Sequence, residues 1–302
     1  RIVYTQWLNE RGGIEADLTV TRLGEHSFLV ITAAAAVTRD LAWLTRHIPA
    51  EAHCTALDVT SGEACLAVMG PRSRDFLQSL TTADLSNAAF PFGTARTIEL
   101  GMALLRAHRI TYVGELGWEL YMPTEFARQI FDLLVDAGET YGLRLAGVHA
   151  MNSLRLEKAY RDFGHDISDE DHVLEAGLGF AVKVDKRPGR FGDFLGRAAV
   201  MQKKQAGLSR GLVQFQLLDP RPLLYHAEPI LKDGKVAGFL ASGGYGHHLG
   251  AAIGLGYVPR EPGATDADLL ASRYEIEVAG ERIPACASMK PLYDPKGARV
   301  RQ

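Results

Sequence analysis

Residues 9–18 have the sequence NERGGIEADL, in which a pair of glycines separates two runs of alternating polar and apolar residues. Alternation at period two is typical of β-strands, and adjacent glycines supply the backbone freedom of a tight turn. The alternation extends on both sides of the pair across residues 1–23. The sequence therefore predicts a β-hairpin here, with Asp17 just beyond its turn.

Outward from this hairpin, strands and helices follow one another before the chain becomes nearly all β. Apolar periodicity predicts strands at 27–32, 54–60, 64–69, 110–112, 118–121 and 177–184, and helices at 33–47, 71–80, 125–141 and 147–159. Short strands at 212–217, 228–231, 234–239, 253–258, 274–278 and 282–284 predict a small β-barrel. The pattern favours an α+β fold over a doubly wound parallel sheet. We place the domains at residues 1–92, 93–205 and 206–302.

Composition excludes several classes of protein. At 47% hydrophobic and 23% charged residues the chain has the balance of a globular protein, and no apolar run approaches the length of a membrane span. A net charge of -3 offers no basic field for nucleic acid. The three cysteines, Cys54, Cys65 and Cys286, form no Cys-x-x-Cys pair, so we expect reduced, buried structural thiols and no zinc site.

Two further segments combine acids with a glycine turn or a helix. Residues 112–119, YVGELGWE, place Tyr112, Glu115 and Glu119 around a turn, and residues 154–160, LRLEKAY, place Glu157 on a predicted helix. From the residues alone, Glu157 is an ordinary helix-surface acid that can pair with Arg161 four positions on. By the same standard, Asp17 is an acid that ends a hairpin turn.

In this order along the chain, the three segments resemble motifs of the glycine-cleavage T-protein (aminomethyltransferase) superfamily. Four more matches extend the resemblance over essentially the whole chain: VMGP at 68–71, DFLG at 193–196, ASG at 241–243 and AIGLGYVP at 252–259. Residues 115–121 and 155–160 are most similar to the C-terminal folate-binding half of dimethylglycine and sarcosine dehydrogenases. The resemblance implies a three-domain cloverleaf around a folate channel, with a C-terminal small β-barrel.

Two departures from the family pattern bear on this expectation. Family members carry a substantial segment before the glycine turn, so we expect an incomplete N-terminal domain and a longer native chain. Ala16 stands where free T-proteins commonly have a second acid, which leaves Asp17 as the candidate at the catalytic position.

The resemblance also implies roles in binding tetrahydrofolate. A reduced pterin presents two parallel donors that match a carboxylate, and Glu157 is the expected acceptor. Tyr112 is expected to stack on the folate, with core packing as the alternative, and Glu115 is a weaker binding candidate that can instead hold its turn. Lys186 belongs to a basic segment suited to the glutamyl tail, or to an ordinary solvated loop.

The implied catalytic role falls to Asp17. A carboxylate beside the folate nitrogens that accept the one-carbon unit can orient the amine and stabilise a cationic, iminium-like state. Burial is expected to raise the pKa of Asp17.

Other conspicuous segments suggest no further cofactor. We take His247 and His248 to be neighbours on a strand, where side chains point to opposite faces and do not form a metal site. The glycine-rich residues 243–246 lack the spacing of a phosphate or dinucleotide loop. If FAD belongs to the complete protein, we expect it in an N-terminal half outside this chain.

We therefore expect a tetrahydrofolate-binding, methylene-transferring module of an FAD-dependent sarcosine or dimethylglycine dehydrogenase-like enzyme that forms 5,10-methylenetetrahydrofolate. Its expected partners are a small methylated amine, or the imine or formaldehyde made from it, and the flavin-binding half of the same protein. The alternatives are a free aminomethyltransferase or folate-dependent demethylase, and a non-catalytic folate-binding module. The expected compartment is the cytoplasm in a bacterium and the mitochondrial matrix in a eukaryote.

Overall fold

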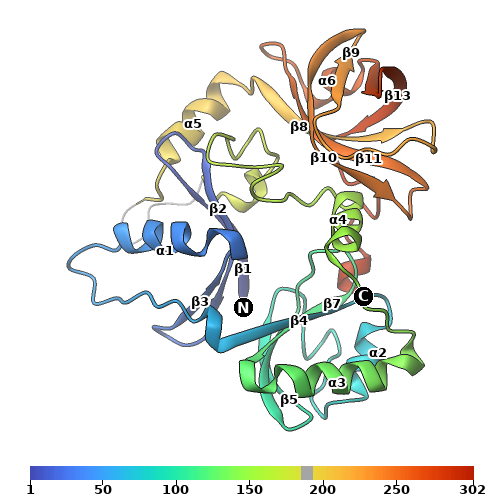
Figure 1. The fold of residues 1–302 in the computed structure, drawn as a ribbon. Coiled ribbons are helices and arrows are strands. Elements are labelled where there is room, and N and C mark those ends of the chain that lie inside the picture. The colour runs from blue at the N-terminus through green and yellow to red at the C-terminus, as the bar shows by residue number, and fades with distance from the viewer. Residues whose placement is uncertain (185–192) are drawn as a thin grey trace. The chain divides into compact units, whose positions relative to one another are not determined.

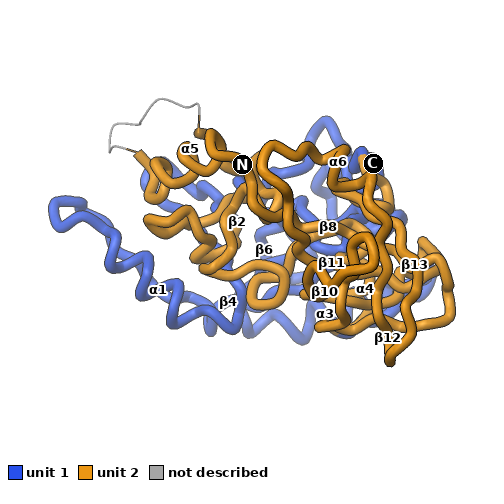
Figure 2. The backbone as a smooth tube through the Cα atoms, turned by 90° about the horizontal axis from the view of Figure 1, so that it is seen from above, with its two compact units in different colours: residues 1–3, 19–147, 296–302 blue, residues 4–18, 148–295 orange. Residues whose placement is uncertain are grey.

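A computed structural model describes residues 1–184 and 193–302, so Lys186 lies outside the described residues. The chain divides into two compact units, each built from discontinuous segments (Figure 2). Unit 1 comprises residues 1–3, 19–147 and 296–302, and unit 2 comprises residues 4–18 and 148–295. The limits at residues 92 and 205 remain predictions about domains.

The hairpin expected from the glycine pair is confirmed. Strands β1 (Ile2–Leu8) and β2 (Ile14–Arg22) join β3 (Phe28–Ile31) in a sheet of order β1-β2-β3. Asn9 Oδ1 accepts the backbone N–H groups of Arg11 and Gly13 at 3.0 and 2.9 Å, which closes the turn. A Cβ atom at Gly13 would lie 2.1 Å from the carbonyl oxygen of Asp169, so only glycine fits there.

Unit 1 is built on a four-stranded antiparallel sheet of order β4-β7-β6-β5. Its strands are β4 (Glu63–Met69), β5 (Ala95–Leu100), β6 (Ala103–His108) and β7 (Gly117–Pro123). Its helices are α1 (Val37–Arg46), α2 (Ser73–Gln78) and α3 (Ala127–Gly138), with short 3-10 turns at Ala34–Ala36, Thr60–Gly62, Thr124–Phe126, Glu139–Tyr141 and Arg299–Arg301. The helix expected at 125–141 is thus confirmed, and Phe90, Trp118 and Ile130 are fully buried in the core.

Two strands expected in unit 1 are wrong. Residues 54–59 form no strand, because their apolar side chains cover nothing: Leu57 is 76% and Val59 48% exposed. Residues 110–112 form none either, since β6 ends at His108 and the next residue, Arg109, exchanges backbone hydrogen bonds with the turn at 93–94. The expectation of buried thiols is also wrong, because all three cysteines are free and exposed.

Unit 2 contains the closed barrel that the C-terminal turn pattern predicted (orange to red in Figure 1). Its order is β10-β11-β8-β13-β12-β9. The strands are β8 (Arg210–Leu217), β9 (Pro229–Lys232), β10 (Lys235–Gly246), β11 (Ala251–Pro259), β12 (Tyr274–Val278) and β13 (Glu281–Ser288). Helices α4 (Val148–Glu157), α5 (Arg197–Ala206) and α6 (Asp266–Leu270) complete the unit, with a 3-10 turn at Gly179–Ala181.

The strand expected at 177–184 is wrong. The chain instead turns back on itself there, because the N–H of Leu178 donates to the carbonyl of Val173 at 3.0 Å and a 3-10 turn follows. Helix α6 was not expected, although Thr265 and Asp268 form a reciprocal capping box at its start. Across the described residues, no helix combines the length and hydropathy needed to cross a bilayer.

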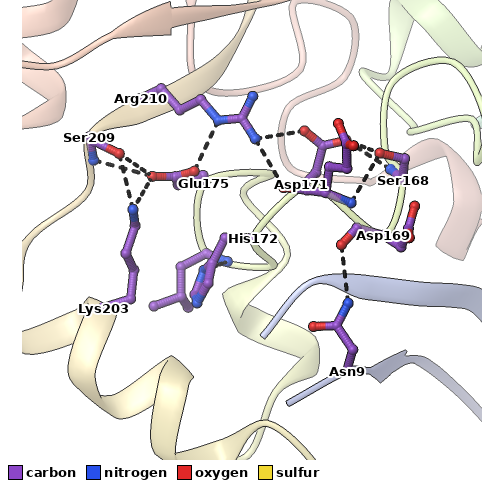
Figure 3. A network of polar contacts seen from close by, with 11 residues as sticks. Asn9, Ser168, Asp169, Asp171, His172, Glu175, Lys203, Ser209 and Arg210 are labelled. Atoms are coloured by element: carbon purple, nitrogen blue, oxygen red, sulfur yellow. Dashed lines mark hydrogen bonds and ion pairs between the residues drawn. The ribbon is translucent and has the colours of Figure 1, made fainter. Parts of the chain in front are cut away.

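A polar network fixes residues 168–178 within unit 2 (Figure 3). Arg210 contacts Glu175 at 3.0 Å and Asp171 at 2.8 Å, and Lys203 contacts Glu175 at 2.6 Å. The same segment holds the hairpin turn, because Asn9 Nδ2 donates to the carbonyl of Asp169 and the N–H of Ile14 to that of Asp171. The network therefore sets the position of the hairpin that carries Asp17.

Candidate functional site

Glu157 is the last residue of α4 and is 2% exposed, so it is not a helix-surface acid. Its Oε1 accepts the backbone N–H groups of His248 at 2.6 Å and Leu249 at 3.1 Å. Among the described residues, both hydrogen bonds to this carboxylate fall on Oε1. The barrel thereby holds a buried carboxylate in one orientation.

His247 and His248 occupy the turn between β10 and β11, and their expected place on a strand is wrong. Their rings pack against different partners: His247 lies 5.2 Å from Tyr245 and His248 lies 4.3 Å from Tyr293 between ring centroids. Over the described ranges, no group of three or more His, Cys, Asp or Glu residues could hold a metal ion. What the turn contributes is the two backbone donors that anchor Glu157.

Asp17 lies on β2 among polar side chains of unit 2. Gln6 Nε2 donates to Asp17 Oδ1 at 2.7 Å, and the hydroxyl of Tyr4 also hydrogen-bonds to this carboxyl group. Burial raises the pKa of Asp17, as expected, while the bonds from Gln6 and Tyr4 and the charge of Arg161 act in the opposite direction. Two neutral donors therefore hold the carboxyl group of Asp17 in place.

Tyr4, Gln6 and Arg161 were not singled out as site residues from the sequence. Burial, reinforced by the carboxylate of Asp17, raises the pKa of Tyr4, so this phenol stays a hydrogen-bond donor. Its ring stacks on that of Phe180 at 6.2 Å. The alternation of β1 places Tyr4 and Gln6 two residues apart on one face, and that spacing is the signal that could have found them.

The other predicted binding residues belong to unit 1. Tyr112 and Glu115 lie half-buried in the loop that joins β6 to β7, where Gly114 adopts φ +76°. Glu119, on β7, accepts the hydroxyl of Tyr121 at 2.6 Å, and burial raises its pKa. Glu119 is thus engaged within its own sheet, while the roles of Tyr112 and Glu115 in ligand binding remain predictions.

Two family models match the chain. The GCVT N-terminal domain matches residues 1–186, and the glycine cleavage T-protein C-terminal barrel domain matches residues 210–294. The second match coincides with the barrel of unit 2.

Comparisons with individual proteins agree with these matches. The chain is 39% identical to 4-methylaminobutanoate oxidase (formaldehyde-forming) of Paenarthrobacter nicotinovorans over 100% of this chain and 35% of that protein. It is 36% identical to human mitochondrial sarcosine dehydrogenase over 99% of this chain and 34% of that protein. It thus spans about a third of the length of these relatives, at 35% and 34%.

Among solved structures, the aminomethyltransferase T of the glycine cleavage system from Bartonella henselae has a TM-score of 0.81 and 25% identity. The likeness covers 98% of this chain and 76% of that one. The α+β aminomethyltransferase fold expected from the sequence is therefore confirmed.

Proposed function

This chain belongs to the glycine cleavage T-protein family, and we propose that it is a tetrahydrofolate-binding, methylene-transferring module of a methylated-amine dehydrogenase or oxidase. The observation that carries the proposal is Glu157, a 2% exposed carboxylate held by two backbone amides. A buried carboxylate needs donors to offset its desolvation, and a ligand with paired N–H groups supplies them. Similarity to sarcosine dehydrogenase and to 4-methylaminobutanoate oxidase supports the same class of enzyme.

Glu157 is proposed to recognise the pterin. The 2-amino group and N3–H of a reduced pterin are two neighbouring donors on one edge. Because Oε1 already accepts two backbone N–H groups, the pterin donors converge on Oε2 in this proposal. Tyr112 is proposed to stack on the folate, Glu115 to assist binding and Lys186 to attract the glutamyl tail.

Asp17 is proposed to serve the transfer step. When bound, tetrahydrofolate supplies the nitrogen nucleophiles that take up a one-carbon unit from formaldehyde or an imine. The carboxylate of Asp17 orients the amine and favours the positive charge that develops as the one-carbon unit is captured. Gln6 and Tyr4 keep Asp17 in place for this role. Holding the amine close to its electrophile contributes as much as acid–base chemistry does.

The source of the one-carbon unit is proposed to lie in the rest of the protein. The relatives are about three times as long as this chain, which covers 35% and 34% of them. We place amine oxidation by FAD in that remaining part, with 5,10-methylenetetrahydrofolate as the product made here. The Paenarthrobacter relative is a formaldehyde-forming oxidase by name, which favours formaldehyde or its imine equivalent as the carbon donor.

Two substitutions separate binding from chemistry. Glu157→Gln puts an NH2 donor against the donors of the pterin and is expected to weaken tetrahydrofolate binding by roughly 1–3 kcal/mol. Asp17→Asn is expected to leave the dissociation constant of tetrahydrofolate nearly unchanged. It is expected to slow methylene capture about a hundredfold or more, which is the usual effect in other enzymes of removing one group that stabilises charge in the transition state. Isothermal titration and the rate of 5,10-methylenetetrahydrofolate formation measure the two effects on the whole protein.

Glu261→Gln is the matched control, because Glu261 is an exposed loop acid and its loss should change neither quantity. Normal folate affinity in Glu157→Gln would show that the pterin lies elsewhere. A full transfer rate in Asp17→Asn would remove Asp17 from the reaction.

A further inference from the structure

Gln6 uses only one half of its side-chain amide within the protein. It lies on β1 and is 8% exposed, and its Nε2 donates to Asp17 Oδ1 at 2.7 Å. Within residues 1–184 and 193–302, the buried Oε1 of the same amide has no hydrogen-bond partner. One carboxamide thus supports the candidate catalytic acid and presents an unsatisfied acceptor beside it.

The orientation of this amide follows from its neighbours. The oxygen and nitrogen of a glutamine amide are assigned from the groups that they face, and a flipped amide would set its oxygen against a carboxylate oxygen of Asp17. Tyr4 gives a second reason. Burial raises the pKa of its phenol, while a hydrogen bond from Gln6 lowers that pKa, which is the effect of a donor. Both neighbours therefore face Nε2, and Oε1 points away from them.

A buried acceptor without a partner indicates that something outside the protein completes the site. Its loss of hydration is not offset inside the chain, and the large majority of buried polar side-chain atoms in folded proteins do have a partner. The carboxyl group of Asp17 adds further acceptor capacity beside Gln6. A ligand that satisfies both groups must bring N–H or O–H donors.

Tetrahydrofolate carries such donors at the atoms that take up the one-carbon unit. Its N5 and N10 are secondary amines with one N–H each, and N5, the more basic of the two, is the first to attack an electrophile. An N5–H group that donates to an amide oxygen keeps the lone pair of N5 available for that attack. Dihydrofolate has the same skeleton, but its N5 has no hydrogen and would set an acceptor against Oε1.

We propose that Gln6 is a specificity-determining residue whose Oε1 accepts the N5–H of bound tetrahydrofolate. This role rests on the proposed function, because it adds a contact to the ligand proposed there. One amide then joins the ligand to the catalytic acid, with Nε2 on Asp17 and Oε1 on N5. A site that accepts an N–H discriminates against the analogue that lacks it, since its acceptor is then left unpaired.

The test compares the dissociation constants of tetrahydrofolate and 7,8-dihydrofolate on the whole protein, by isothermal titration without oxygen. The native protein is expected to bind tetrahydrofolate about tenfold more tightly, because dihydrofolate leaves Oε1 unpaired. Gln6→Met keeps the length of the side chain without its amide. In this variant tetrahydrofolate binding should weaken about tenfold, while dihydrofolate binding changes less than about twofold, so the preference largely disappears.

Gln6→Glu and Gln205→Met complete the set of variants. Gln6→Glu retains an acceptor oxygen at this position, so its preference for tetrahydrofolate should stay close to that of the native protein. It also decides the question if Gln6→Met does not fold. Gln205→Met is the matched control, because Gln205 is an exposed residue of α5 and its loss should change neither dissociation constant.

Three results would each overturn the role of Gln6. The native protein could bind both ligands equally tightly, which needs no variant to measure. Gln6→Met could weaken both ligands alike, as expected of a residue that only supports Asp17. Gln6→Glu could lose the preference for tetrahydrofolate although it keeps an acceptor.

Failure of this role is distinct from failure of the proposed function. A whole protein that binds no tetrahydrofolate, or a full capture rate in Asp17→Asn, rejects the proposed function whatever Gln6 does. A protein that binds tetrahydrofolate and is slowed by Asp17→Asn, yet does not discriminate against dihydrofolate, rejects only the role of Gln6.

Discussion

The two acids at the centre of this account differ in how far the sequence could identify them. Asp17 and Glu157 stand in recognisable motifs, so resemblance found both positions. Their surroundings could not be found in that way, because the hairpin of Asp17 is held by a segment 160 residues further along the chain, through the bond from Asn9 to the carbonyl of Asp169. The anchoring of Glu157 by backbone amides at 248 and 249 carries almost no sequence signal, since every residue except proline offers a backbone N–H.

A glycine next to Glu157 allows a prediction at this scale. A Cβ atom at Gly246 would lie 3.2 Å from Glu157 Oε1 and 3.2 Å from Ile253 Cδ1. Gly246→Ala should therefore displace the carboxylate and weaken tetrahydrofolate binding by about 1 kcal/mol, or roughly fivefold, without any change of charge. Isothermal titration measures the loss.

The control for that variant is Gly147→Ala, because a Cβ atom at Gly147 meets nothing within 4 Å. Equal folate affinity in Gly246→Ala and Gly147→Ala would mean that the position of Oε1 does not matter for binding.

Among the elements, turn residues predicted the positions of the strands better than runs of apolar residues did. The barrel strands were found because Gly and Asp mark their ends, as at the two-residue turn of Asp233 and Gly234, with φ +52° and +82°. The runs at 54–60 and 177–184 misled, because an apolar pattern does not reveal whether another element covers it. Strand formation depends on that cover.

The turn between β12 and β13 provides a prediction about stability. Ala279 and Gly280 adopt φ +50° and +85°, the same geometry as at Asp233 and Gly234, but alanine is poorly suited to the first position. Ala279→Asn should raise the free energy of unfolding by about 0.5–1 kcal/mol, since Asn tolerates a left-handed backbone and the position is exposed. Urea denaturation measures the gain.

Asp233→Ala is the reciprocal variant and should lower the stability by a similar amount. If Ala279→Asn instead lowers the free energy of unfolding, the positive φ angle at residue 279 does not limit the stability of the barrel.

At the scale of the whole molecule, the response of stability to acid should depend on Glu175. Burial alone would raise the pKa of Glu175, but hydrogen bonds from Lys203, Ser209 and Arg210 lower it to about 2. Because the folded value lies below the unfolded value of about 4.3, the stabilisation is present above that pH and is lost as the pH falls towards 2.

Glu175→Gln should therefore lower the stability at pH 7 and flatten its decline between about pH 4.3 and 2. Urea unfolding across that range measures the slope, with the exposed Glu261→Gln as control. If the free energy of unfolding of Glu175→Gln falls with pH as steeply as that of the native protein, other carboxylates cause the sensitivity to acid.

The central claim is that this module captures a one-carbon unit on bound tetrahydrofolate, and one rate comparison tests it most directly. The measurement is the rate of 5,10-methylenetetrahydrofolate formation from formaldehyde, with tetrahydrofolate saturated by the whole protein and with the same tetrahydrofolate free in solution. If the site orients the amine beside Asp17, the bound folate should react faster than the free one, and the reaction should slow in Asp17→Asn. A bound folate that reacts no faster than the free one would contradict the claim and leave a folate-binding module without catalysis.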